Sequence, residues 1–221
     1  MTLYLLPNLL HENADPRSSL VPAIEDIIYD LDGFYVETPK IARVFLKNFD
    51  FDRLRDKPME IIGKKGSNEK EILAPLKRGE SWGVISDAGQ PCIADPGSQV
   101  VGLSRRLGIK VISFPGPCSI IHALSVSGLD GNKFTFHGYV PKKFDDSFLK
   151  EKGIHIFIET PYNNNPTIKK ILGVIKPRDI LCVACDLMSD TEEVVTMKAS
   201  TWANEERDFH KRPAIILVQV R

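Results

Sequence analysis

The stretch Val84-Ile-Ser-Asp-Ala-Gly-Gln-Pro-Cys-Ile-Ala-Asp-Pro-Gly97 decides the fold of this chain. The apolar run Trp82–Ile85 predicts a strand, and a turn with two Gly, two Pro and two Asp residues follows it. A helix is expected to begin at Ser98, a good N-cap, and to end before Gly108. Long turns from strand to helix are where parallel α/β sheets bind ligands, so the stretch also predicts a ligand site.

Four residues of this turn are candidates for function. Gly89 and Gly97 would let the backbone come close to a ligand, because glycine has no side chain. Asp87 and Asp95 would place carboxylates at the mouth of the site. An ordinary connection between strand and helix is the alternative interpretation. Two Asp residues at this spacing are unusual in a plain connector, so the functional interpretation is preferred.

Strands and helices are expected to alternate along the first half of the chain, which predicts a mostly parallel sheet with helices on both faces. The polar stretch Asn8–Ser19 is expected to be a loop. The other expected strands are Leu3–Leu6, Phe34–Val36 and Met59–Ile62, and the helices are Leu20–Leu31, Ile41–Asn48 (capped by Thr38) and Asn68–Leu76.

A second α/β domain is expected after the turn around Gly116-Pro117, so that the domains comprise residues 1–114 and 115–221. The hydrophobic pattern predicts helices at Ser119–Val126, Phe144–Lys152, Thr167–Ile175 and Thr201–Glu206, and strands at Lys110–Ser113, Phe134–His137, Ile154–Ile158, Ile180–Ala184, Glu192–Met197 and Ala214–Val220. The last two strands follow one another and suggest an antiparallel pair. The second sheet should therefore be mixed.

Composition and charge narrow the class of protein. With 221 residues, of which 43% are hydrophobic and 26% charged, the chain can bury a real core. It has no apolar run of membrane-spanning length and no leader pattern, so no membrane partner is expected and a cytoplasmic location is the default. The formal net charge is zero, whereas proteins that grip free nucleic acid are usually basic. Basic doublets such as Lys142-Lys143 are expected to be mainly solvated surface.

Metal and phosphate sites are not expected. Cys182-Val-Ala-Cys185 lies in an apolar run, and residues three apart on a strand point to opposite faces, so these thiols would not chelate one ion together. The five His residues are scattered. The sequence has neither of the glycine-rich patterns that bind nucleotide phosphates, which disfavours ATP and dinucleotides as ligands.

The turn that opens this section resembles the S-D-A-G-T-P-x-I-x-D-P-G signature of the tetrapyrrole methylase superfamily. More narrowly, it is similar to the branch of bacterial 16S rRNA (cytidine-2′-O)-methyltransferases. A second segment, Phe114-Pro-Gly-Pro-Cys-Ser119, matches the P-G-P-[CS]-A turn of that family at the expected distance. The resemblance continues through Gly138-Tyr-Val-Pro-Lys142 and Phe157-Ile-Glu-Thr-Pro161 to Pro213-Ala-Ile-Ile-Leu-Val218, and so spans most of the chain.

The resemblance implies that S-adenosylmethionine (SAM) is bound in a cleft between the two domains, that ribosomal RNA accepts the methyl group, and that the protein is a homodimer. Many of the implied SAM contacts are made by backbone or apolar groups, so side-chain identity is only partly informative. The contacts that it implies fall on Pro7, Asp87, Ala88, Gly89, Gln90, Cys118, Ser119, Glu159, Leu187 and Ala214.

Methyl transfer from SAM is an in-line displacement, so positioning of the acceptor supplies much of the rate. A ribose hydroxyl is a poor nucleophile and would benefit from a base. Asp87, Asp95 and Glu37 are the carboxylates best placed by the sequence to act as that base. The sequence does not choose among them.

The sequence departs from the family pattern in several places. No Gly follows Pro7 where the family has P-x-x-x-G-N-L. The family's E-D-T-R, Y-E-S-P-H-R and K-G-E become Glu37-Thr-Pro-Lys40, Ile158-Glu-Thr-Pro-Tyr-Asn163 and Lys211-Arg-Pro213.

Three functions therefore remain open. The leading one is a SAM-dependent methyltransferase that modifies a ribose 2′ oxygen of ribosomal RNA, with the small ribosomal subunit as partner. The second is a methylase of a tetrapyrrole-like small molecule, which the loss of the family's basic residues favours slightly and the overall signature disfavours. The missing Gly after Pro7 motivates a third interpretation, a SAM-binding module without transferase activity.

Overall fold

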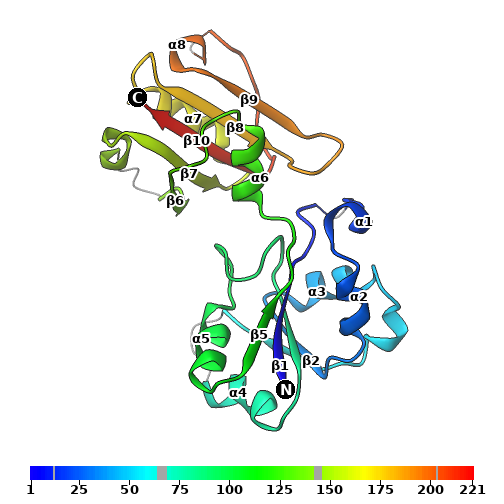
Figure 1. Cartoon of the computed structure of the whole chain (residues 1–221). Coiled ribbons are helices and arrows are strands. Elements are labelled where there is room, and N and C mark those ends of the chain that lie inside the picture. Colours follow the sequence, from blue (N-terminus) through cyan, green and yellow to red (C-terminus); the bar gives the residue numbers. More distant parts are fainter. Residues whose placement is uncertain (12, 64–68, 142–145, 203) are drawn as a thin grey trace. The chain divides into compact units, whose positions relative to one another are not determined.

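The computed structural model describes residues 1–11, 13–63, 69–141, 146–202 and 204–221, which form two compact units (Figure 1). Unit 1 comprises Met1–Cys118 and unit 2 comprises Ser119–Arg221. The sequence predicts a domain boundary between residues 114 and 115, and this stays a prediction. Three features expected from the sequence lie outside the described residues: the doublet Lys142-Lys143, and the starts of two helices at Asn68 and Phe144.

Unit 1 is built on a five-stranded sheet whose neighbouring strands, within the described residues, are all parallel, as the sequence predicted. The sheet order is β3-β2-β4-β1-β5. Because the strands are parallel, all of their carboxyl ends lie at one edge, where α/β sheets place their ligand-binding turns. The strands are β1 (Thr2–Leu6), β2 (Gly33–Val36), β3 (Met59–Ile61), β4 (Trp82–Ile85) and β5 (Lys110–Ser113).

Helices cover both faces of this sheet. Alternate residues of a strand point to opposite faces, so apolar strands such as these need cover on both. Leu5 and Val84 belong to one buried cluster, and the residues that follow them, Leu6 and Ile85, belong to the other. The first cluster includes residues of α4 and α5, the second residues of α2 and α3. The helices of unit 1 are α1 (Pro16–Ser19), α2 (Ala23–Ile28), α3 (Pro39–Leu46), the 3₁₀ helix η1 (Phe51–Arg53), α4 (Glu69–Lys77) and α5 (Ser98–Arg106).

The first helical region differs from the sequence prediction. One helix was expected over Leu20–Leu31, but two short helices flank residues 20–22. Pro16, expected within a loop, begins α1, because proline has the backbone angle that a first helical residue needs. Asp15 caps this helix, with its Oδ1 accepting from the backbone N–H of Arg17 at 2.9 Å.

The start of α5 also differs in its cap. Ser98 is the first helical residue, and Gly97 occupies the N-cap with φ +127°. A Cβ on Gly97 would lie 2.8 Å from the Sγ of Cys92. Both the backbone angle and the limited space therefore require glycine at this position. The prediction that Ser98 is the cap was therefore wrong. Gly108, by contrast, follows the C-cap with φ +70°, as expected of a helix-ending glycine.

Unit 2 is built on a mixed five-stranded sheet of order β6-β7-β10-β8-β9. Strands β6 and β7 are parallel and the other pairs are antiparallel, so the prediction of a mixed sheet is confirmed. The expected pairing of the last two strands was wrong, because β9 pairs with β8 and the final strand inserts between β7 and β8. The strands are β6 (Phe134–Tyr139), β7 (Gly153–Glu159), β8 (Ile180–Cys185), β9 (Glu193–Lys198) and β10 (Ala214–Val220).

Phe157, Ile216 and Trp202 belong to one buried cluster on one face of the sheet of unit 2, and residues of the opposite face, such as Ile156 and Leu217, are buried too. The expected helix Phe144–Lys152 is, in its described part, a short 3₁₀ helix, and the one expected near Thr201–Glu206 lies earlier. The helices are α6 (Ser119–Val126), η2 (Ser147–Lys150), α7 (Asn164–Leu172) and α8 (Ala199–Trp202). Within the described parts of the chain, no helix is both long enough and apolar enough to cross a membrane.

Candidate functional site

The loops after β1 and β4 are joined at the carboxyl edge of the first sheet. The backbone of Asn8 donates to the carbonyl of Gly89 at 2.9 Å, and Gly89 donates back to Asn8 at 3.1 Å. The side chain of Asn8 is buried, and its Nδ2 donates to the carbonyls of Ser86 at 3.0 Å and Asp87 at 3.1 Å. Its Oδ1 accepts from the N–H of Leu9 at 2.7 Å. Asn8 therefore stabilises the turn at residues 86–97, called the signature turn below, although it does not belong to it.

The turn that follows β5 lies against the same loops. A Cβ on Gly116 would lie 2.2 Å from the Cγ of Pro7, and a Cβ on Gly89 would lie 3.1 Å from the carbonyl oxygen of Pro117. The Nε2 of Gln90 donates to the Oγ of Ser113 at 2.9 Å. The structure thus brings the candidates Pro7, Gly89 and Gln90 against the turn that ends in Cys118. Their role toward a ligand stays a prediction.

The three candidate carboxylates of unit 1 are electrostatic neighbours. Asp87 is held most tightly, because its Oδ1 accepts from the backbone N–H of Thr38 at 3.0 Å and its Oδ2 from the Thr38 hydroxyl at 2.7 Å. Glu37 precedes Thr38 at the end of β2, and its Oε2 is buried with no hydrogen-bond partner among the described residues. Asp95, from the far end of the same turn, feels the charges of both other carboxylates.

Burial and this crowding raise the pKa values of Glu37 and Asp95. Burial, and then repulsion from Asp87, raise the pKa of Glu37 above its usual value. Burial, and then repulsion from Glu37 and Asp87, raise the pKa of Asp95 to about 7. A carboxyl group with such a pKa can accept or release a proton near neutral pH, as general catalysis requires. Among the described residues no group of His, Cys, Asp and Glu side chains is arranged to hold a metal ion.

Three candidates of unit 2 converge at one end of the second sheet. Ala214, the first residue of β10, is the register partner of Glu159 on β7 and of Cys185 on β8. Leu187 follows Cys185 by two residues and, like Ala214, is buried. The fourth candidate, Ser119, begins α6.

The carboxylate of Glu159 is occupied by contacts within unit 2. Its Oε1 accepts from the backbone N–H of Thr160 at 2.6 Å and from the Thr160 hydroxyl at 3.1 Å. Its Oε2 accepts from the hydroxyl of Thr167 on α7 at 2.5 Å. The side chain thus anchors α7 to the end of β7. Any ligand would meet this part of the unit through the backbone more readily than through the carboxylate.

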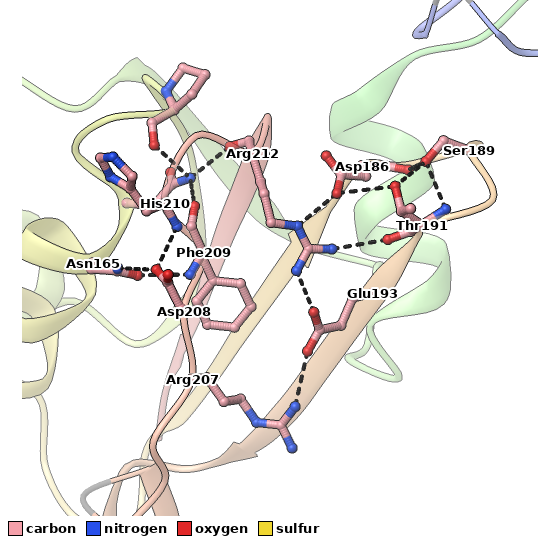
Figure 2. A network of polar contacts seen from close by, with 12 residues as sticks. Asn165, Asp186, Ser189, Thr191, Glu193, Arg207, Asp208, Phe209, His210 and Arg212 are labelled. Carbon is pink, nitrogen blue, oxygen red and sulfur yellow. Dashed lines mark hydrogen bonds and ion pairs between the residues drawn. The ribbon is translucent and has the colours of Figure 1, made fainter.

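Beside this strand end lies a polar network that the sequence did not reveal (Figure 2). The guanidinium of Arg212 contacts Asp186, the carbonyl of Thr191 and Glu193, and Arg207 contacts the other oxygen of Glu193. The sequence marked Lys211-Arg-Pro213 only as a departure from the family pattern. No spacing rule points to these partners, because they come from the turn after β8, the start of β9 and the segment before β10.

The sequence is similar to curated proteins named ribosomal RNA small subunit methyltransferase I. The one from Buchnera aphidicola subsp. Schizaphis graminum is 32% identical over 171 residues, which are 72% of this chain and 60% of that protein. The one from Vibrio cholerae is 28% identical over 226 residues, which are 98% of this chain and 76% of that protein. The likeness to proteins of this name extends over nearly the whole chain. The chain spans less than two thirds of the Buchnera relative, so what the longer proteins act on becomes a proposal for this chain.

A solved structure shares the fold of this chain. The solved structure of uroporphyrin-III-C-methyltransferase from Thermus thermophilus matches with a TM-score of 0.56 and 14% identity, over 99% of this chain and 94% of that one. At this identity the likeness establishes the two-sheet α/β architecture and nothing finer. No protein-family model matches the chain.

Proposed function

We propose that this protein is a SAM-dependent methyltransferase that modifies a ribose 2′ oxygen of ribosomal RNA in the small ribosomal subunit. The observation that carries the proposal is the gathering of Glu37, Asp87 and Asp95 beside the signature turn, in a chain that is similar to this family. The family members are named for methyl transfer to small-subunit ribosomal RNA, and the carboxylates supply the proton chemistry that a hydroxyl acceptor needs.

The groups of unit 1 fit a ligand that carries a positive charge and no phosphate. The buried Oε2 of Glu37 has no partner among the described residues, and a sulfonium would suit the negative potential that it shares with Asp87 and Asp95. The first N–H groups of α6 would suit the carboxylate of SAM, because the start of a helix has donors without intrahelical partners. When bound, SAM supplies an electrophilic methyl group. The proposed contacts are Pro7, Asp87, Ala88, Gly89, Gln90, Cys118, Ser119, Glu159, Leu187 and Ala214.

The three carboxylates would have different roles in the reaction. Asp87 accepts two hydrogen bonds from Thr38 and would hold the turn and the positive charge of the cofactor. Glu37 and Asp95 both have raised pKa values, so this pair would take up the proton of the acceptor hydroxyl. A base is most effective when its pKa lies near the working pH, which favours Asp95 with its value of about 7.

The charge balance of the chain favours a large, folded acceptor. With zero net charge, only local basic clusters would attract RNA, and a few phosphate contacts give weak, salt-sensitive binding. A ribosomal subunit also offers a folded surface whose shape can complement that of the protein, which a free oligonucleotide lacks. The cytoplasm would be the place of such a reaction. The homodimer implied by the family resemblance belongs to the proposal and needs a sedimentation measurement.

Two assays in sequence test the proposal. Calorimetry should first give one SAM site per chain. Tritiated methyl transfer should then label ribosomal RNA in unmodified small subunits of the source organism and leave free nucleotides unlabelled. Transfer to a tetrapyrrole precursor, with subunits unmodified, would assign the protein to the small-molecule methylases. SAM binding without transfer to either acceptor would leave a binding module.

A further inference from the structure

Arg212 joins three parts of unit 2 through one guanidinium group (Figure 2). Its Nε donates to the Oδ2 of Asp186 at 2.7 Å, and its Nη2 donates to the carbonyl of Thr191 at 2.9 Å. Its Nη1 donates to the carboxylate of Glu193. Arg212 precedes β10, Asp186 follows β8, and Glu193 begins β9. One side chain therefore fixes the turn between β8 and β9 to the strand that lies beside β8.

The turn that Arg212 holds is one that a chain does not adopt freely. Asp186 has φ +49° and Met188 has φ +63°, and such angles are unfavourable for residues other than glycine. Local contacts offset part of this cost: the N–H of Met188 donates to Glu192 at 2.7 Å, and the hydroxyl of Ser189 donates to the carbonyl of Asp186 at 2.7 Å. Leu187 lies between the two strained residues, so its backbone position depends on these contacts.

The backbone of Arg212 is fixed as firmly as its side chain. Its carbonyl accepts from the Nδ2 of Asn164 at 2.7 Å, and this amide is buried. On one side, the N–H of Lys211 donates to the carbonyl of Pro161 at 2.8 Å. On the other side, the carbonyl of Pro213 accepts from the N–H of Asp186 at 3.0 Å. The guanidinium thus projects from a fixed point toward the turn.

The charges of the network balance in a partly desolvated place. The side chain of Arg212 is 23% exposed and that of Asp186 is 12% exposed. Burial lowers the pKa of Arg212, but hydrogen bonds to Glu193 and Asp186 outweigh it and keep the guanidinium charged. Without Arg212, Asp186 would lose this cation and Glu193 would keep only Arg207. The turn would lose two hydrogen bonds and the start of β9 one.

We propose that Arg212 is a positioning residue for methyl-donor binding: it holds the backbone at Leu187 beside Ala214, in the arrangement that the cofactor meets. This inference rests on the proposed function, because Leu187 and Ala214 are SAM contacts only there. Leu187 adjoins Asp186, and Ala214 lies two residues after Arg212 and pairs with Cys185, so the guanidinium couples the two contacts directly. Lysine would not replace it, since a single ammonium lacks the planar fork that reaches three acceptors.

Arg207 offers a matched control. It is the second cation on Glu193, at 3.0 Å from the Oε1, and its side chain is 36% exposed. It also donates to Glu205, and among the described residues it makes no hydrogen bond to Asp186 or to the turn that precedes Glu193. Loss of Arg207 removes surface ion pairs of comparable chemistry while the fixed turn remains.

The experiment compares Arg212→Met, Arg212→Lys and Arg207→Met by calorimetry with SAM and by steady-state methyl transfer. Both Arg212 variants should bind SAM about tenfold more weakly, which corresponds to about 1.4 kcal/mol. They should raise the KM for SAM with kcat changed less than about twofold, since cofactor binding and not the chemical step is affected. Arg207→Met should keep the wild-type affinity, and any change should be confined to its unfolding midpoint.

Wild-type SAM affinity in folded Arg212→Met would overturn the inference, and so would equal losses in Arg212→Met and Arg207→Met. If Arg212→Met does not fold, Asp186→Asn replaces it, because this change keeps the shape and removes the charge that Arg212 binds. It should then weaken SAM binding in the same direction, and unchanged affinity would overturn the inference. Absence of SAM binding by the wild-type protein would instead refute the proposed function on which the inference rests.

Discussion

Thr38 donates both its backbone N–H and its hydroxyl to the carboxylate of Asp87, at 3.0 and 2.7 Å. Thr38 is the N-cap of α3, yet its side chain makes no capping bond to that helix. The hydroxyl donates instead to Asp87, 49 positions away, and this bond joins the end of β2 to the turn after β4. The geometry of the carboxylate cluster depends on this pair, because Glu37 adjoins Thr38 and Asp87 repels Glu37 and Asp95.

The first prediction concerns this pair. Thr38→Val keeps the shape and removes the hydroxyl donor, and should lower the free energy of unfolding by about 1–2 kcal/mol, as expected for a hydrogen bond to a charged group. Urea unfolding at pH 8 measures the change. Thr38→Ser keeps the donor and should lose clearly less. Equal losses in the two variants would show that the methyl group, and not the hydroxyl, carries the effect.

The second prediction concerns pH. The pKa of Asp95 is about 7 in the folded protein against 3.8 for an ordinary aspartate, so the native state binds more protons than the unfolded state between these values. Stability contributed by this group therefore falls as the pH rises from about 4 to 7. Asp95→Asn removes this loss, and its unfolding free energy should gain on the wild type across that window by an amount on the order of 1–2 kcal/mol.

Urea unfolding at pH 4.5 and pH 8 checks the sign. The difference between Asp95→Asn and wild type should be larger at pH 8 than at pH 4.5. Glu37 titrates in the same direction, since its pKa is also raised, so the wild-type curve alone is not diagnostic. A difference that is constant with pH would mean that Asp95 is not buried among like charges.

The sequence was informative where local pattern and tertiary structure agree. The apolar runs at Trp82–Ile85 and Ala214–Val220 are strands with the predicted bounds, because each is short, β-prone and buried. It failed where a choice depends on distant partners. In the second sheet β9 pairs with β8, and the final strand, β10, lies between β7 and β8. The sequences of β9 and β10 do not determine this order. The two short helices flanking Pro22 read as one amphipathic run.

The candidate site shows the same division. The signature turn indicated Asp87 and Asp95, and the end of β2 indicated Glu37, and the three are electrostatic neighbours. Asn8 was not indicated, although it makes three side-chain hydrogen bonds that fix the turn. An Asn directly after a strand is usually a turn former, and only the structure shows that its amide faces carbonyls from residues 86 and 87.

The third prediction tests Asn8. Asn8→Ala should lower the free energy of unfolding by about 1–3 kcal/mol, because it removes a buried side chain that satisfies two carbonyls and one N–H. Asn8→Asp should be worse than Asn8→Ala at pH 8, since a carboxylate cannot donate and would face the carbonyls of Ser86 and Asp87. Chemical denaturation ranks the two. The opposite ranking would mean that the Nδ2 contacts contribute little.

The fourth prediction concerns Gly89. The sequence predicts that this glycine lets the backbone come close to a ligand, so that a side chain here would block the ligand. In the structure Gly89 has φ +67°, and a Cβ would lie 2.9 Å from Leu10 and 3.1 Å from the carbonyl of Pro117. The fold itself therefore needs glycine at this position, and even Gly89→Ala should cost about 1–3 kcal/mol of stability.

Gly102 supplies the control for this prediction. It lies inside α5, and a Cβ there would meet no atom within 4 Å. Gly102→Ala should raise the free energy of unfolding by about 0.5–1 kcal/mol, because alanine favours the helix interior. Thermal or urea unfolding should thus move in opposite directions for the two Gly→Ala variants. If both are stabilised, the space at Gly89 is open, and a bulky residue there becomes a valid probe of ligand approach after all.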